Sequence, residues 1–417
     1  MEPFSLEDFA GRYNPFSSSQ LEDPYPTYKI ARREAPVFYS PVLHMWVVTR
    51  YDDIVAIYRN PAVFTSANLL KSRYEPTPEA RRILKEGGYD RPPIIVDNDT
   101  PSHPRIRGAV QRSFTPGRAA KFEPALRALA NELVDAFEGE GRVDLIPKFA
   151  YPIPIRVLFE LLGVPLSDMD RVKRWVEEWV KFMWATPGPE EQSVCAHAMV
   201  AFRRYCIDLL EDRKRSPRED LMSALVQGSG SGEEIMTMNE LAYLMNDLLF
   251  AGQDTTTTAI GNVVRLLLSY PDHFRALRSD PGLVPAAVEE AMRMTSPAQC
   301  GVRTTLQEAQ IAGVTVPAGV DLCLVLGSAH RDEAHFPNPD TFDLRRGVHE
   351  KTLEFGNGRH ACLGAGLARL ELRVAVEVLS QRLPTLRLAP DQPVSYVPNL
   401  LSRSLSRLDV AWDLPAG

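Results

Sequence analysis

The chain has 417 residues, of which 44% are hydrophobic and 24% charged, and its formal net charge is −7. This length exceeds the usual limit for one hydrophobic core, so we expect two lobes or one large compact unit. The negative charge and the lack of a basic tract argue against a nucleic-acid partner. Because no run is apolar enough to cross a bilayer and no basic, apolar leader opens the sequence, we expect a cytoplasmic protein without a membrane partner.

The first 65 residues predict a small β region. An irregular segment that contains prolines leads into a short helix at Pro24–Arg32. Val37–Tyr39 and Met45–Thr49 are β-branched and aromatic runs separated by a turn, which predicts two strands. Tyr51–Tyr58 then has helical spacing.

Residues 66–100 form a polar stretch with little periodicity beyond a short predicted helix near Glu79–Leu84. It contains Gly87-Gly88 and Pro92-Pro93, which favour turns. A loop of this length inside a compact domain is usually functional or mobile, and the alternative is a solvated insertion.

His103 and Arg107 follow this loop and are four residues apart, so they lie on one face of a predicted helix. Considered alone, such a pair is typical of a solvated basic face.

Helical periodicity then predicts amphipathic helices at roughly 118–138, 151–162, 166–185 and 191–214. Phe182 belongs to a cluster of aromatic residues on the third of these helices, and such a cluster is usually core. Pro187 and Pro189 interrupt the helical pattern directly after this cluster.

The segment from Thr237 to Tyr270 predicts one long helix. Thr237 and Glu240 have the spacing of a capping box, and apolar residues recur at helical intervals to Tyr270. The centre, Phe250 to Thr258, contains a glycine, an acid and four successive threonines, and glycine alone costs about 1 kcal/mol against alanine. A buried helix with such a weak centre needs a functional reason, and the alternative is a polar kink.

Two further segments complete the frame. Glu290 and Arg293 are three residues apart on a predicted helix, where a surface pair contributes only about 0.5 kcal/mol. Strands are predicted at Ile311–Thr315 and Leu322–Leu326.

The segment Phe355–Gly364 contains three glycines and one of the five cysteines, Cys362. Glycines at this density predict a bend or a close backbone approach. Apolar residues at helical spacing follow, so we expect Cys362 at a helix N-terminus, where the helix dipole favours a thiolate. The cysteines are odd in number and widely spaced, which indicates a reducing compartment and one functional thiolate. The alternatives are a buried structural cysteine and a zinc site, but His360 and Cys362 have no second ligand pair.

This segment reads Phe-Gly-x-Gly-x-His-x-Cys-x-Gly and resembles the haem-ligand loop of the cytochromes P450 at every fixed position. The resemblance implies the cytochrome P450 fold, mainly α with a smaller β region, and a haem b (iron protoporphyrin IX) between a long central helix and the cysteine-loop helix. Cys362 would be the axial ligand of the iron. We expect a single domain over 1–417. Its β-rich lobe comes mainly from 36–65, 298–326 and a C-terminal hairpin at 385–413, and its α-rich lobe from 101–295 and 362–383.

The same resemblance extends to the centre of the long helix, where Ala251 to Thr255 is similar to the oxygen-binding groove of the family. By this resemblance Gly252 leaves room for O2, and Asp254 and Thr255 form the acid–alcohol pair that carries protons. A buried site needs a fixed proton relay of this kind.

The remaining site residues are also implied by the resemblance. The haem-binding residues would be propionate partners and residues that line the haem: His103, Arg107, Arg303, His360, Phe355, Gly356, Gly364 and Ala251. A buried structural group would join Glu290 and Arg293 to Arg346, in preference to Arg345. The substrate pocket would include Phe182, Ala251, Ala298, Gln299, Leu400 and Leu401, beneath a mobile helix-loop-helix lid that contains the aromatic helix and the break at Trp184–Pro189.

The resemblance implies a haem-thiolate monooxygenase that inserts one oxygen atom from O2 into a small organic substrate, by hydroxylation or by O- or N-dealkylation. The aromatic lid and the polar loop favour a small aromatic substrate with one polar group. Electrons would come from an external ferredoxin and ferredoxin reductase. The ferredoxin would dock on a basic patch comprising Arg112, Arg359, Arg369 and Arg373. Within the family, Pro36–Pro41 and Gly87–Tyr89 resemble the haem domains of self-sufficient bacterial P450s fused to their own reductase.

Two other functions remain open. A peroxygenase would use H2O2 and need no ferredoxin, but the Asp254–Thr255 pair argues against it because that relay serves O2 activation. A haem-based ligand sensor or carrier would need neither a relay nor a lid.

Overall fold

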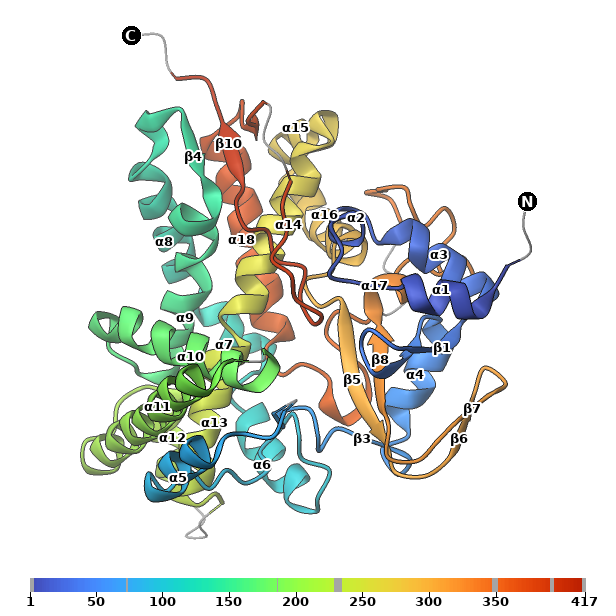
Figure 1. Ribbon diagram of the computed structural model, residues 1–417. Coiled ribbons are helices and arrows are strands. Elements are labelled where there is room, and N and C mark those ends of the chain that lie inside the picture. The colour runs from blue at the N-terminus through green and yellow to red at the C-terminus, as the bar shows by residue number, and fades with distance from the viewer. Residues whose placement is uncertain are drawn as a thin grey trace. The chain divides into compact units, whose positions relative to one another are not determined.

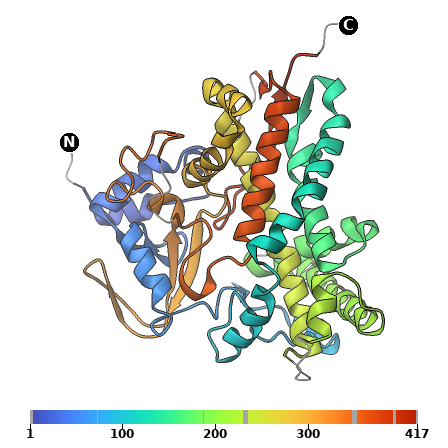
Figure 2. The same ribbon diagram turned by 180° about the vertical axis from the view of Figure 1, so that it is seen from behind.

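The computed structural model describes residues 4–72, 74–185, 187–228, 235–346, 352–390 and 394–414 (Figures 1 and 2). The chain divides into two compact units. The first unit comprises Met1–Thr65, Pro116–Pro154 and Asp254–Gly417, and the second unit comprises Ser66–Thr115 and Ile155–Gln253.

The first unit contains a five-stranded sheet in the order β1-β2-β8-β5-β3 (Figure 1). The strands are β1 Val37–Ser40, β2 Met45–Val48, β3 Phe64–Thr65, β5 Cys300–Thr305 and β8 Asp321–Val325. Strand β2 is parallel to β8, and the other pairs are antiparallel. Val48, Ile54 and Leu322 are fully buried where helix α4, Tyr51–Arg59, packs on this sheet. The two predicted N-terminal strands and the helix after them are therefore confirmed.

Residues 311–315, predicted as one strand, instead span the turn of a hairpin. Strands β6, Ala309–Ile311, and β7, Val314–Val316, pair in antiparallel fashion. Ala312 and Gly313 form the turn with φ values of 48° and 79°. Two successive residues with positive φ are what a tight two-residue hairpin turn requires, and this turn was missed because its first residue is alanine.

Helices form the rest of the first unit, together with a second sheet of order β4-β10-β9. Helix α18 packs against α7, α8, α14, α15 and α16, and Figure 2 shows α18 (red) beside α8 (teal). The helices are α1 Leu6–Arg12, α2 Ser18–Glu22, α3 Tyr25–Glu34, α7 Pro116–Lys121, α8 Glu123–Asp135, α14 Asp254–Leu268, α15 Pro271–Ser279, α16 Val284–Met294, α17 Leu326–Ala329 and α18 Ala365–Arg382. The remaining strands are β4 Arg142–Asp144, β9 Arg387–Leu388 and β10 Asp409–Ala411.

The helix predicted over 118–138 is two helices, α7 and α8. Phe122 lies between them, and Pro124 occupies the first turn of α8. Proline lacks the N–H that a continuous helix would use at this point, whereas in the first turn of a helix that N–H has no intrahelical partner to lose. The proline therefore starts a new helix instead of continuing the old one.

In the second unit, α11 packs against α5, α10, α12 and α13. Its helices are α5 Pro78–Glu86, α6 Ser102–Gln111, α9 Pro152–Leu162 (which begins just ahead of the unit), α10 Met169–Trp184, α11 Pro189–Arg215, α12 Leu221–Val226 and α13 Met238–Ala251. Trp179 and Phe182 of α10 are buried in the core with Cys195 and Met199 of α11. The predicted aromatic cluster is thus part of the core of this unit.

Short irregular turns of helix connect several of these elements. They are η1 Glu138–Glu140, the π-helical η2 Ile146–Ala150, η3 Leu166–Asp168, η4 Pro281–Leu283 and η5 Gly358–His360.

The predicted long helix begins as expected but is broken at its weak centre. Thr237 Oγ1 accepts the Glu240 N–H at 3.2 Å and the Glu240 carboxylate accepts the Thr237 N–H at 2.8 Å, which confirms the capping box. Helix α13 then ends at Ala251 and α14 begins at Asp254. The prediction of one continuous helix is therefore wrong, although the interruption falls at Gly252, where helix propensity is lowest.

The protein is mainly α with smaller β regions, as the sequence predicted. Within the described ranges, no helix combines the length and the apolar character that crossing a membrane requires.

Candidate functional site

The segment Phe355–Gly364 forms a tight loop that exposes the Cys362 thiol. The Cys362 N–H donates to the Phe355 carbonyl at 2.8 Å and closes the loop. Gly356 and Gly358 have φ values of 69° and 74°, in the left-handed region that favours glycine. Cys362 is exposed, whereas the other four cysteines are buried.

Helix α18 begins three residues after Cys362, at Ala365, with Gly364 as its N-cap residue. The expectation that Cys362 itself lies at the helix N-terminus is therefore corrected, because Gly364 delays the start of the helix. A Cβ on Gly364 would lie 3.9 Å from Cys362 Sγ, so the N-cap residue packs close to the thiol.

The aromatic ring of Phe355 packs against a guanidinium group. The Arg369 guanidinium lies 4.4 Å from the centre of the Phe355 ring. Glu289 of α16 fixes Arg369, with distances of 2.6 Å to Nε and 3.1 Å to Nη2. Because α16 and α18 both belong to the first unit, the loop is braced against its helical core.

A buried carboxyl and a buried imidazole lie just ahead of the loop. His330 Nε2 accepts the Leu353 N–H at 2.7 Å, and burial lowers the pKa of His330 to about 3. Burial also raises the pKa of Glu354, whose Oε2 lies 3.5 Å from His330 Nε2. Because the imidazole is neutral, this close approach is not an ion pair.

The expected propionate partners are divided between the two units. In the first unit Arg303 is buried on β5 and His360 is half-buried in η5. In the second unit His103 is buried and Arg107 is half-buried on one face of α6.

The expected oxygen-groove residues flank the break between α13 and α14. A Cβ on Gly252 would lie 3.3 Å from both methyl carbons of Leu158 and from the Leu248 carbonyl, so the residue must be small. Asp254 and Thr255 are exposed, whereas Thr256 is buried. Desolvation nevertheless raises the pKa of Asp254, so this carboxyl holds a proton to a higher pH than an ordinary aspartate.

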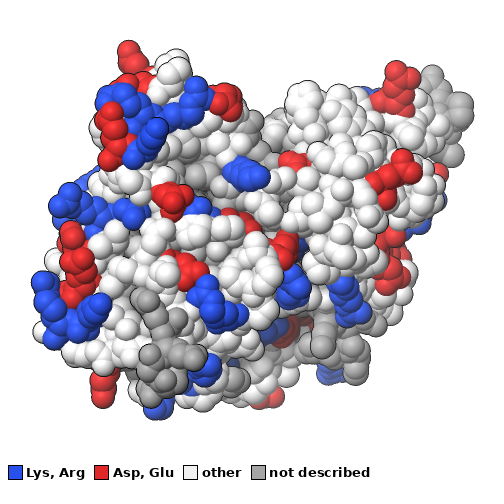
Figure 3. Space-filling view, turned by 90° about the horizontal axis from the view of Figure 1, so that it is seen from below, with Lys and Arg blue, Asp and Glu red and all other residues white. Residues whose placement is uncertain are grey.

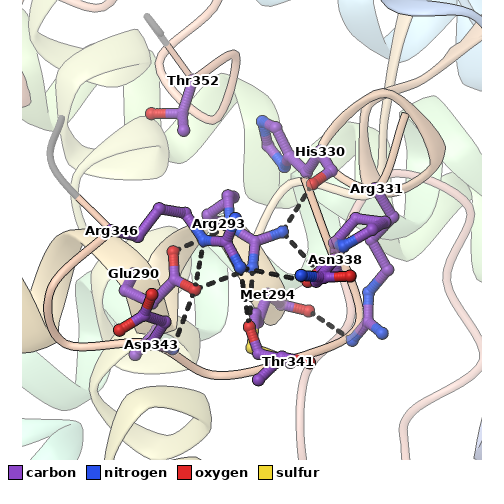
Figure 4. A network of polar contacts seen from close by, with 12 residues as sticks. Glu290, Arg293, Met294, His330, Arg331, Asn338, Thr341, Asp343, Arg346 and Thr352 are labelled. Atoms are coloured by element: carbon purple, nitrogen blue, oxygen red, sulfur yellow. Dashed lines mark hydrogen bonds and ion pairs between the residues drawn. The ribbon is translucent and has the colours of Figure 1, made fainter. Parts of the chain in front are cut away.

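Glu290, Arg293 and Arg346 lie together in the first unit (Figure 4). Arg293 Nε and Nη2 both donate to the Glu290 carboxylate at 2.8 Å, and Arg346 Nε donates to Glu290 Oε1 at 2.8 Å. The Arg293 Nη1 also donates to the His330 and Pro339 carbonyls, at 2.8 and 2.9 Å. This network ties α16 to the loop that carries Arg346.

The expected pocket residues form two groups. In the first unit Ala298 pairs with Ser402, and the Gln299 N–H donates to the Leu401 carbonyl at 2.8 Å, which brings this stretch beside Leu400 and Leu401. The Gln299 side chain donates to the Ser296 carbonyl at 2.9 Å. It lines a cavity of about 30 Å3, a volume suited to water instead of substrate. Phe182 and Ala251 belong to the second unit.

Two members of the expected basic patch are engaged with acids. Arg369 pairs with Glu289, and Arg373 pairs with Glu123 and Glu377 at 2.5 and 3.2 Å. On the face shown in Figure 3, basic side chains are interspersed with acidic ones. These pairs reduce the net positive charge that Arg369 and Arg373 present.

Comparison with known proteins assigns the family. A family model described as Cytochrome P450 matches residues 38–281 and 282–398. The chain is 37% identical over 372 residues to the mycinamicin IV hydroxylase/epoxidase of Micromonospora griseorubida, and the match covers 88% of this chain and 89% of that protein. The chain belongs to the cytochrome P450 family.

Solved P450 structures have the same fold. Cytochrome P450 CREJ, in complex with (4-ethylphenyl) dihydrogen phosphate, is similar with a TM-score of 0.91 and 33% identity, covering 97% of this chain and all of that one. An intact type IV self-sufficient cytochrome P450 monooxygenase gives a TM-score of 0.91 and 36% identity, covering 97% of this chain and 53% of that one. The predicted P450 fold and the resemblance to self-sufficient P450s are confirmed, and the enzyme is a P450 monooxygenase.

Haem with a cysteine thiolate ligand is the cofactor that the P450 family implies, and the residues present fit it. Cys362 offers an exposed thiol at the end of a loop whose geometry is fixed by two left-handed glycines. The buried guanidinium of Arg303, in the same unit, suits a carboxylate partner.

Sequence reasoning missed two residues that contact the P450 cysteine loop. The Tyr58 carbonyl lies against Gly358, and Arg59 Nε donates to Asn357 Oδ1 at 3.1 Å. Both come from the end of α4, about 300 positions earlier in the chain, and no local pattern in the sequence indicates the contact.

Proposed function

We propose that this P450 uses Cys362 as the axial thiolate of haem b and hydroxylates or dealkylates a small organic substrate. The observation that carries this assignment is the exposed Cys362 thiol in a loop closed by the Cys362–Phe355 hydrogen bond. When bound, the haem iron supplies the binding of O2 and its reductive cleavage, so that one oxygen atom enters the product and the other leaves as water. The chain's own residues must then hold the thiolate, deliver protons and orient the substrate.

Proton delivery is assigned to Asp254 and Thr255. Two protons and two electrons are consumed for each O2, so a group that can repeatedly take and give a proton is required near the substrate. The raised pKa of Asp254 suits this role because the pKa of this carboxyl lies closer to neutral pH than that of an ordinary aspartate. The Thr255 hydroxyl, adjacent in the first turn of α14, can accept a proton from water and donate one onward.

We assign the buried cation Arg303, together with His360, His103 and Arg107, to the haem propionates. Arg303 is nearly excluded from water, and a buried guanidinium is stabilised when it pairs with an anion through charge-assisted hydrogen bonds. Phe355, Gly356, Gly364 and Ala251 would line the haem.

The substrate that we propose is a small aromatic compound with one polar group. The structure of P450 CREJ contains (4-ethylphenyl) dihydrogen phosphate, an alkylated ring of this type, and its fold matches 97% of this chain with a TM-score of 0.91. In the first unit, the adjacent stretches that carry Ala298, Gln299, Leu400 and Leu401 support a role in substrate contact. Phe182 and Ala251 of the second unit are assigned to the substrate by the family resemblance alone.

We propose that electrons arrive one at a time from a ferredoxin reduced by ferredoxin reductase. Ferredoxins are acidic, so the contact would use Arg112, Arg359, Arg369 and Arg373 after some of their present acidic partners are displaced.

The deciding experiment compares Cys362→His with Cys195→Ser. In the latter, a serine hydroxyl can replace the thiol that donates to Glu178 at 3.0 Å. The reduced carbon monoxide complex of the wild type and of C195S should show the absorption of a thiolate-ligated haem, and substrate turnover should be retained. The C362H protein should lose both. A thiolate-type spectrum in C362H would overturn the ligand assignment.

A further inference from the structure

Tyr58, near the end of α4, contacts a proposed haem-binding residue. The guanidinium carbon of Arg303 lies 4.7 Å from the centre of the Tyr58 ring. Both residues are 7% exposed, so the pair is buried. A guanidinium is attracted electrostatically to an aromatic face, and its planar shape allows it to stack there. Arg303 Nη1 also donates to the Val302 carbonyl at 2.7 Å, so the Tyr58 ring and this carbonyl together favour one direction for a long side chain that has many rotamers.

Glycine at position 301 leaves room for the phenol. A Cβ on Gly301 would lie 2.1 Å from the Tyr58 hydroxyl oxygen and 3.2 Å from the ring carbon that bears it. Gly301 and Arg303 are two residues apart on β5, so the same strand both makes room for Tyr58 and presents the guanidinium to it. No larger residue fits at 301 while the phenol keeps this position.

The main chain of the same residue meets the cysteine loop. A Cβ on Gly358 would lie 2.7 Å from the Tyr58 carbonyl oxygen, and Gly358 has a φ of 74°, so glycine is required here on two grounds. The neighbouring Arg59 Nε donates to Asn357 Oδ1 at 3.1 Å. The end of α4 thus touches β5 on one side and the loop that carries Cys362 on the other.

We propose that Tyr58 is a positioning residue for the haem. Its ring orients Arg303 toward a propionate, and its main chain sets the distance between Arg303 and the loop that holds Cys362. This inference rests on the proposed function, because that function assigns Arg303 and Cys362 to the haem. Tyr58 itself carries out no chemical step.

The first test replaces the ring and measures haem release by transfer to excess apomyoglobin. Tyr58→Leu removes the aromatic face and should release haem roughly tenfold faster. Tyr58→Phe keeps the face and should remain within about twofold of the wild type. Tyr39→Phe, at an exposed tyrosine of β1, is the matched control and should change nothing. A wild-type release rate in Y58L would overturn the proposal.

The second test is a rescue, which a general loss of stability cannot imitate. Gly301→Ala in the wild type brings the new Cβ onto the phenol oxygen and should displace the ring and accelerate haem release. In the Tyr58→Phe background the nearest atom is gone and the remaining contact of 3.2 Å needs only a small adjustment, so most of the effect should disappear. If G301A accelerates haem release equally in the wild type and in the Y58F background, the proposal is contradicted. This test does not use Y58L, so it decides the proposal even if Y58L fails to fold.

Arg303→Leu separates this inference from the function on which it rests. If R303L releases haem at the wild-type rate, the assignment of Arg303 to a propionate fails, and the inference fails with it. If R303L accelerates release but Y58L does not, the assignment stands and only the role of Tyr58 is overturned. The reduction potential of the bound haem, measured for the same variants, should shift in R303L and Y58L in the same direction and stay unchanged in Y39F.

Discussion

Arg91 and Asp247 form a buried ion pair in the second unit, with 2.8 Å between Arg91 Nη2 and Asp247 Oδ2. The same guanidinium also binds Asp97, so one cation bridges two carboxylates whose side chains are 8% exposed. Arg91 and Asp97 belong to the polar 66–100 segment, and Asp247 belongs to α13. This segment is therefore fastened to α13 by a charge cluster with a formal charge of −1.

This cluster predicts a specific dependence of stability on pH. Burial, reinforced by Asp97 and opposed by Arg91, raises the pKa of Asp247 to about 6. The unfolded chain releases this proton near pH 4, so the free energy of unfolding falls as pH rises from about 4 to 6. In the wild type the free energy of unfolding, measured by denaturant titration, should include a fall of about 3 kcal/mol between pH 4 and 6 that comes from Asp247. Asp247→Asn should abolish this part of the pH dependence. An unaltered difference between pH 4.5 and pH 7 in D247N would contradict the prediction.

Arg293→Ala should prevent stable folding or haem retention. The substitution leaves the buried carboxylate of Glu290 without its bidentate partner, and breaking such a buried pair costs about 3–5 kcal/mol. Thermal unfolding and the haem-to-protein ratio after purification measure the effect. Arg345→Ala, at an exposed neighbour of Arg346, is the control and should behave like the wild type. A stable, haem-replete R293A protein would show that the network is dispensable.

Thr255→Ala and Asp254→Asn should uncouple electron consumption from product formation. Without the hydroxyl or the acid, protons reach O2 by an unpositioned route, and a positioned proton donor typically contributes a factor of about 100 or more. We expect NAD(P)H consumption to continue with ferredoxin and its reductase, while product falls and H2O2 accumulates. Thr256→Ser, at the buried neighbouring threonine, should retain coupling. Full coupling in T255A would remove Thr255 from the relay.

Glu371→Gln should stabilise the enzyme in mildly alkaline solution. Glu371 is buried on α18, and burial raises its pKa to about 8. The native state thus retains a proton that the unfolded chain has released, and the free energy of unfolding of the wild type falls as pH rises from about 4.5 to 8. The amide avoids this loss, which is on the order of 5 kcal/mol across the window. If the unfolding midpoints of E371Q and the wild type run parallel from pH 5 to 8, Glu371 is not responsible for any pH-linked loss.

Signals that are local in the chain predicted their structures well. The Thr237–Glu240 capping box needs only four residues, and the structure shows both of its hydrogen bonds. Glycines around Cys362 predicted a bend, and the positive φ values of Gly356 and Gly358 provide it.

One contact between distant residues was also predicted, because the family resemblance supplied it. The spacing typical of the family placed Arg346 beside Glu290, although 56 residues separate them.

Features that depend on distant residues escaped prediction. The contact between Tyr58 and Arg303 joins α4 to β5 and requires glycine at 301, but a single glycine in a strand pattern does not say which side chain fills the space. The Arg91–Asp247 pair likewise spans 156 residues. The sequence predicted a weak centre in the long helix but not its division into α13 and α14, because helix propensity gives only an energetic cost and does not say whether the helix continues through it.

One cysteine is exposed and four are buried, so the reactivity of Cys362 can report which fraction of the protein has haem bound. A bulky maleimide added briefly to the native apoprotein should alkylate Cys362 far ahead of the other thiols, because only its sulfur is accessible. Coordination to iron would shield that sulfur. The fraction of chains that gain one label, read by intact-mass spectrometry, would then count the chains that have lost their haem, without any need for an optical signal.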